Sequence, residues 1–125
     1  MNVQSLAQRA YSTNSAPTRS ARSMEYEIIA RVTYRLKAAA QKGRLGFSQL
    51  AQALHENQEL WIALAADVSD ADNGLPDDLR ARVFYLAEFT RTHTKRVLDG
   101  ADSVAPLLEV NTAILKGLRQ GALVK

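Results

Sequence analysis

Apolar residues recur at intervals of three and four along most of the chain, the spacing that places them on one face of an α-helix. The pattern predicts four helices, beginning near residue 20 or 23, at 47, at 76 and between 103 and 106, and ending near residues 42, 68, 99 and 120. Gly, Pro, Asp and Asn residues separate these segments. Sustained alternation with a period of two is absent from the sequence, so the predicted fold class is an all-α bundle.

A fifth, short helix is predicted at the N-terminus. Val3, Leu6, Ala7, Ala10 and Tyr11 form one apolar stripe, and a segment rich in Ser and Thr follows. We therefore predict a single domain of 125 residues, with an N-terminal helix over 1–11, a linker over 12–20, a helical core over 21–120 and a tail over 121–125. Because a helix this short is marginally stable alone, it has to dock on another surface.

The same periodicity predicts which side chains are buried. The expected inner positions are Ile28, Ile29, Val32, Leu36, Ala39, Ala40, Phe47, Leu50, Leu54, Trp61, Leu64, Ala65, Val68, Leu79, Val83, Leu86, Ala87, Thr90, Val97, Leu98, Leu107, Val110, Ile114, Leu115 and Leu118. Phe84 lies beside the stripe of its helix, so we expect it to be exposed.

The amino-acid composition excludes several classes of catalytic and metal-binding site. With no Cys and two His among 125 residues, the sequence offers neither a thiolate metal site nor a Cys nucleophile. It also lacks the common phosphate-binding, metalloprotease and nucleophile-elbow motifs. We expect a non-enzymatic protein with no cofactor, no metal and no small-molecule substrate. Its longest apolar run has six residues, which predicts a cytoplasmic protein without a membrane partner.

Charge is distributed unevenly. Residues 1–46 contain eight basic and two acidic residues, a balance of +6, whereas residues 47–125 contain eight basic and eleven acidic residues, a balance of −3. A basic segment of this kind can attract acidic partners, including nucleic acid, but a solvated helix face together with a mobile arm is the simpler explanation.

Three asparagines occupy positions where apolar residues are expected. Asn57 precedes Trp61 by one turn, Asn111 lies in the apolar stripe of the last helix, and Asn73 precedes Gly-Leu-Pro. A buried amide without partners costs about 1–3 kcal/mol. These residues therefore either cap helix ends and fix helix register, or line a groove that binds a partner.

These residues also carry a resemblance to a known family. Residues 53–61, ALHENQELW, resemble the "ALxxNxxLW" core of the flagellar biosynthesis regulator FlaF of alphaproteobacteria, although Gln58-Glu59 stand where a more basic pair is expected. Residues 73–81 are similar to its "NxLPxxLRA" segment, Phe89 and His93 to its "FxxxH" stretch, and residues 108–118 to its last helix. The resemblance implies structural roles for Asn73, Leu75, Pro76, Arg80 and Gly117.

The resemblance implies a role in the synthesis or secretion of flagellin, together with or opposed to the regulator FlbT, which is linked to flagellin mRNA. Our first hypothesis is a chaperone-like module that binds a helix of flagellin in an interhelical groove. The expected partner-binding residues are Val3, Leu6, Tyr11, Asn57, Trp61, Phe84, Phe89, Asn111 and Leu118. If Trp61 faces the partner, Trp61→Ala abolishes binding and barely changes the melting temperature; if it is core, the protein is destabilised.

The alternative hypothesis is an RNA-associated regulator that acts with FlbT. Its phosphate contacts would come from the basic residues of the first third, namely Arg19, Arg22, Arg31, Arg35, Lys37, Lys42 and Arg44. Binding to RNA would weaken steeply with salt, whereas an apolar complex with flagellin would not.

Overall fold

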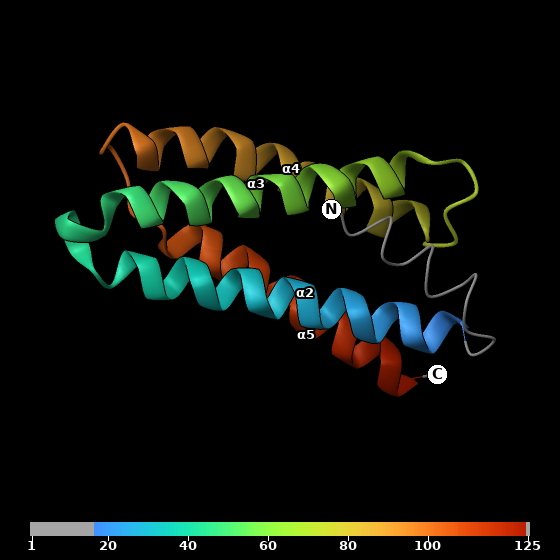
Figure 1. Cartoon of the computed structure of the whole chain (residues 1–125). Coiled ribbons are helices and arrows are strands. Elements are labelled where there is room, and N and C mark those ends of the chain that lie inside the picture. Colours follow the sequence, from blue (N-terminus) through green and yellow to red (C-terminus); the bar gives the residue numbers. More distant parts are fainter. Residues whose placement is uncertain (1–16, 125) are drawn as a thin grey trace.

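The computed structural model describes the chain from residue 17 to residue 124, and the side chains of residues 25–117. This part contains four α-helices, α2 (Pro17–Ala40), α3 (Phe47–Ser69), α4 (Asp77–Leu98) and α5 (Ala105–Val124), and a 3₁₀-helix, η1 (Gly43–Gly46) (Figure 1). The predicted all-α fold is confirmed. The short helix predicted over residues 1–11 lies outside the described residues.

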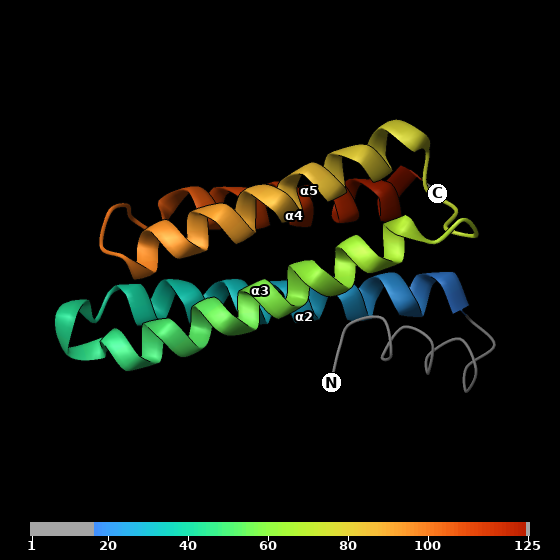
Figure 2. The same cartoon turned by 90° about the horizontal axis from the view of Figure 1, so that it is seen from above.

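The helices run alternately in opposite directions along one long axis (Figures 1 and 2). α2 and α3 form a hairpin, α4 packs along α3, and α5 returns along α2. The contact between α4 and α5 is the smallest among the neighbouring helices. The result is an up-down-up-down bundle, the topology expected of helices joined by short loops.

Two glycines fix the turn between α2 and α3. Gly43 has a φ of 65°, a left-handed conformation that favours glycine at the end of a helix. Gly46 is buried, and a Cβ atom there would lie 2.5 Å from Cβ of Lys42. Gly43 to Gly46 therefore form a turn between two helices.

Two predicted boundaries are wrong. α2 begins at Pro17, inside the segment predicted as a linker over 12–20. Proline is well suited to the first turn of a helix, where its missing N–H has no helical partner to lose. α5 continues to Val124, through Gly121 and most of the predicted tail. A glycine in a helix costs only about 1 kcal/mol relative to alanine, which does not suffice to end it.

Most of the predicted inner positions do form the core. Buried apolar side chains come from all four helices and include Ile29, Val32, Leu36, Ala39, Leu54, Trp61, Val68, Val83, Val97 and Leu107. Phe47, Leu79 and Leu98 were predicted to be inner positions but are 53%, 37% and 41% exposed. Each lies in the first or last turn of its helix, where the neighbouring helices no longer cover it.

Within residues 17–124, none of the helices has a stretch both long and apolar enough to span a bilayer.

Candidate functional site

A chain of buried polar side chains crosses the centre of the bundle. Trp61 Nε1 donates a hydrogen bond of 2.8 Å to Asn111 Oδ1. Asn111 Nδ2 in turn donates to Asn57 Oδ1 at 2.8 Å and to Thr33 Oγ1 at 3.0 Å. The Thr33 hydroxyl donates to the Ile29 carbonyl at 2.6 Å. One amide on α5 thus joins α2 and α3, and we call these side chains of Thr33, Asn57, Trp61 and Asn111 the amide network.

The amide network corrects part of the predicted binding surface. Asn57 and Asn111 are 0% exposed and Trp61 is 1% exposed. The prediction that these three residues face a partner is wrong for this folded state, because the neighbouring helices cover them completely. Of the two interpretations of Asn57 and Asn111, the structure supports the one in which they fix helix register. Buried polar groups that are satisfied only in one arrangement specify that arrangement.

Phe84, on the other hand, is exposed as predicted. It is 49% exposed, and the adjacent Tyr85 is 68% exposed. With Ala81, which is also exposed, they lie at i, i+3 and i+4 on the outer face of α4. We call Ala81, Phe84 and Tyr85 the α4 patch. The sequence analysis missed Tyr85, although its position beside Phe84 and away from the inner stripe was the signal for it.

Phe89 is less accessible than a binding residue should be. It is half-buried and packs against the cluster around Leu36 and Leu54. Its ring stacks on His93, with ring centroids 5.3 Å apart. His93 Nε2 is 2.8 Å from the Ser103 carbonyl oxygen, across the turn between α4 and α5. The predicted pair of Phe89 and His93 therefore anchors the turn and does not form a free surface.

The motif residues between α3 and α4 hold the turn together. Asn73 Nδ2 donates to the Asp67 carbonyl at 3.1 Å, while Asn73 Oδ1 accepts from the Leu75 backbone N–H at 2.9 Å. Pro76 directly precedes α4, and Leu75 packs against the Trp61 cluster. The geometry agrees with the structural roles implied by the resemblance.

Arg80 caps the end of α3 from the next helix. Its Nε donates to the Val68 carbonyl at 2.9 Å and its Nη2 to the Asp70 carbonyl at 3.0 Å. Carbonyls at a helix end have no partner within the helix, and a guanidinium can serve two of them at once.

Arg80→Ala should therefore lower the free energy of unfolding by about 1–2 kcal/mol. Arg80→Lys keeps the charge but has no planar fork, so it should recover less than half of that loss. Thermal unfolding followed by circular dichroism measures both variants. Full recovery in the lysine variant would show that charge at the helix end, and not the paired hydrogen bonds, stabilises this turn.

Gly117 does not fit the structural role expected of it. A Cβ atom at this position would meet nothing within 4 Å, and the residue is exposed on α5. Packing among the described side chains therefore gives no reason for a glycine here. Of the other predicted binding residues, Val3, Leu6 and Tyr11 lie outside the described residues, as does the side chain of Leu118.

The basic residues predicted to contact RNA lie on α2, in the turn that follows it and in η1. Arg31, Arg35, Lys37, Lys42 and Arg44 are all exposed, whereas the side chains of Arg19 and Arg22 lie outside the described residues. Arg35 Nη1 is 3.2 Å from a carboxylate oxygen of Glu56, and Lys42 Nζ donates to Gln49 Oε1. The first interaction joins α2 to α3, and the second joins the turn that follows α2 to α3.

Two carboxylates of the described residues have shifted pKa values. No group of three or more His, Asp or Glu side chains among them could hold a metal ion. Partial burial, and secondarily the nearby charge of Asp70, raise the pKa of Asp67. A hydrogen bond from Arg96 lowers the pKa of Asp102. Asp67 lies in the last turn of α3 and Asp102 in the turn between α4 and α5, so the two carboxylates lie near opposite ends of α4.

The fold and its buried side chains define a class: an antiparallel four-helix bundle fixed in register by an internal amide network. The sequence model of one family, described as flagellar protein FlaF, matches residues 7–118. The chain therefore belongs to the FlaF family of flagellar proteins. Neither a curated protein nor a solved structure matches the chain.

Proposed function

We propose that this protein is a non-enzymatic, cytoplasmic adaptor of flagellum biogenesis that promotes the synthesis or secretion of flagellin by binding flagellin itself. Membership of the FlaF family supports the flagellar setting. The proposal rests on the α4 patch, where the aromatic side chains of Phe84 and Tyr85 are exposed on an otherwise polar helix face.

Helices at the surface of a bundle normally bury one apolar face and expose a polar one. α4 departs from this rule, since it buries Val83, Thr90 and Val97 and still exposes Phe84 and Tyr85 on the other side. The apolar face of an amphipathic partner helix can pack against exposed side chains spaced at i, i+3 and i+4, as neighbouring helices do in a bundle. Flagellin, whose terminal segments are helical and amphipathic, is a partner of this chemistry.

The magnitude of the apolar contribution sets a requirement on the partner. Covering both aromatic rings removes roughly 200 Å² from water, equivalent to about 5 kcal/mol. Association itself costs about 4–15 kcal/mol. The partner helix must therefore contact more than the two rings, and α4 offers a polar rim in the exposed pair of Arg91 and Glu88, whose charged atoms are 3.1 Å apart.

The test is complex formation with the flagellin of the same organism, measured by size-exclusion chromatography with light scattering at about 0.05 and about 0.5 M salt. The native chain should co-elute with flagellin at both concentrations. A Phe84→Ser/Tyr85→Ser variant should lose the complex and keep its helical circular dichroism spectrum. Ile62→Ser is the matched control, because Ile62 is 61% exposed and belongs to a different helix, α3.

Two results of the same experiment would contradict the proposal. Absence of a complex at both salt concentrations would exclude direct flagellin binding by this chain alone. Loss of the complex in the Ile62 variant as well would mean that general surface hydrophobicity, and not the α4 patch, drives association.

A second candidate function is RNA-associated regulation together with a FlbT-type protein. The exposure of all five described cations between Arg31 and Arg44 favours it. It predicts that the protein shifts the flagellin message in a gel assay, with an affinity that falls steeply as salt rises. The α4 variant should leave this activity unchanged.

A further inference from the structure

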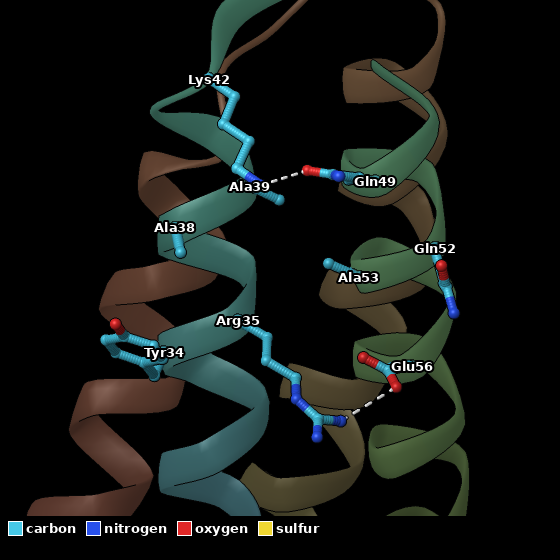
Figure 3. A pocket seen from close by; sticks show the side chains of 9 residues that line it. All are labelled: Tyr34, Arg35, Ala38, Ala39, Lys42, Gln49, Gln52, Ala53 and Glu56. Atoms are coloured by element: carbon cyan, nitrogen blue, oxygen red, sulfur yellow. Dashed lines mark hydrogen bonds and ion pairs between the residues drawn. The ribbon is translucent and has the colours of Figure 1, made fainter. Parts of the chain in front are cut away.

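A second surface of the bundle lies between α2 and α3 and differs in its chemistry from the α4 patch. Nine residues line an open groove of about 440 Å³ there (Figure 3). α2 contributes Tyr34, Arg35 and Ala38 with Ala39 and the following Lys42, and α3 contributes Gln49, Gln52, Ala53 and Glu56. We propose that this α2–α3 groove binds an extended, acidic peptide segment of a partner protein.

The two walls of the groove differ in chemistry. Both cations, Arg35 and Lys42, come from α2 and the turn that follows it, whereas α3 supplies two amides and one carboxylate. Arg35 reaches across to Glu56 at 3.2 Å, and Lys42 reaches across to Gln49. Each cation thus forms a bridge over the groove (Figure 3).

These bridges are weak enough to be exchanged. The side chains of Arg35 and Glu56 are 54% and 35% exposed, and an ion pair in such a setting contributes about 0–1 kcal/mol. Lys42 is held only by a neutral amide, so an incoming carboxylate is a better acceptor for it. Arg35 uses Nη1 toward Glu56 and keeps further donors for a second carboxylate.

The distance between the two bridges and the small side chains that line the groove both suit a peptide with an extended main chain. The bridges from Arg35 and Lys42 end on Glu56 and Gln49, which are seven residues apart on α3 and therefore about 10.5 Å apart along its axis. In a polyproline II segment, side chains three residues apart share one face and are about 9 Å apart. Ala38, Ala39 and Ala53 carry no bulk that would keep a peptide backbone out of the groove, and the Gln49 and Gln52 amides can donate to it and accept from it.

Single-stranded RNA fits this groove less well. Its phosphates follow one another at every nucleotide, and Glu56 would repel those that pass along the α3 wall. A peptide with separated carboxylates avoids this repulsion. The position of Glu56 thus favours the peptide over the nucleic acid.

The experiment uses a fluorescein-labelled probe in which glutamates occupy every third position between proline pairs, Glu-Pro-Pro-Glu-Pro-Pro-Glu. Its control carries glutamine in place of each glutamate. Fluorescence anisotropy with the full chain should show binding of the acidic probe only. Arg35→Glu/Lys42→Glu should weaken that binding by at least about tenfold.

The matched control variant is Arg82→Glu/Lys116→Glu, which changes the net charge by the same amount at exposed positions of α4 and α5. It should bind the acidic probe within about twofold of the native chain. Circular dichroism and the melting temperature establish that both variants are folded. The Phe84/Tyr85 variant should also bind normally, so that failure of the flagellin proposal and failure of this one are distinguishable.

Three outcomes would overturn the inference. Equal binding of the glutamate and glutamine probes would remove the role of charge. Equal weakening by the two charge-reversed variants would assign the effect to net charge alone. Tighter binding of a ten-nucleotide oligouridine, lost in the Arg35/Lys42 variant, would make the groove a nucleic-acid site.

Discussion

Trp61→Ala should lower the free energy of unfolding by about 3–5 kcal/mol, the usual cost of truncating a fully buried aromatic residue. The side chain is 1% exposed, packs against Val68 and Val83, and donates its indole N–H to Asn111. For a domain of this size, each kcal/mol shifts the melting temperature by about 3–5 °C. A loss of about 3 kcal/mol or more should therefore lower the melting temperature by at least about 9 °C, which thermal unfolding detects easily.

The neighbouring Ile62 is the control for this prediction. It is 61% exposed on the same helix, so Ile62→Ala should change the free energy of unfolding by less than about 1 kcal/mol. If Trp61→Ala instead melts like the native chain and loses its complex with flagellin, the tryptophan faces the partner and the bundle rearranges on binding.

The contrast between Trp61 and Phe84 shows what the helical periodicity of the sequence can and cannot predict. Spacing at three and four residues is a local property of the sequence, so it identified the helices and most of the residues they bury. It could not decide whether a residue at the edge of the stripe would be covered, because that depends on where the neighbouring helices end. Phe47, Leu79 and Leu98 were misplaced for this reason.

Only part of the amide network could be predicted from the sequence. The sequence marks Asn57 and Asn111 as polar residues in apolar stripes. Asn111, however, is 54 positions from its partner Asn57 and 50 positions from its partner Trp61. No local rule pairs residues over such a separation, so the choice between helix register and a binding groove had to come from the structure. The turn between α3 and α4 was easier to predict, because a local cluster of Gly, Pro, Asp and Asn marks it. The structural role of Arg80, whose acceptors are 12 and 10 positions away, was implied by the family resemblance.

Asn111→Leu should be the second most damaging substitution, at about 3 kcal/mol or more. It leaves Trp61 Nε1 and Asn57 Oδ1 without their hydrogen-bond partner inside the bundle, and each orphaned buried group costs about 1–3 kcal/mol. Urea unfolding with an unchanged m-value measures the loss.

Asn57→Leu is the informative comparison, since both asparagines are 0% exposed and have the same size. Among the described residues, Asn57 Nδ2 has no hydrogen-bond partner, so the native chain already carries that cost. Removing Asn57 should therefore destabilise the protein by clearly less than removing Asn111. The double variant should cost less than the sum of the two single variants, because the bond between them is counted twice in that sum. Equal single effects that add would mean that the two amides act independently, and the network would then not be what holds α5 in register with α2 and α3.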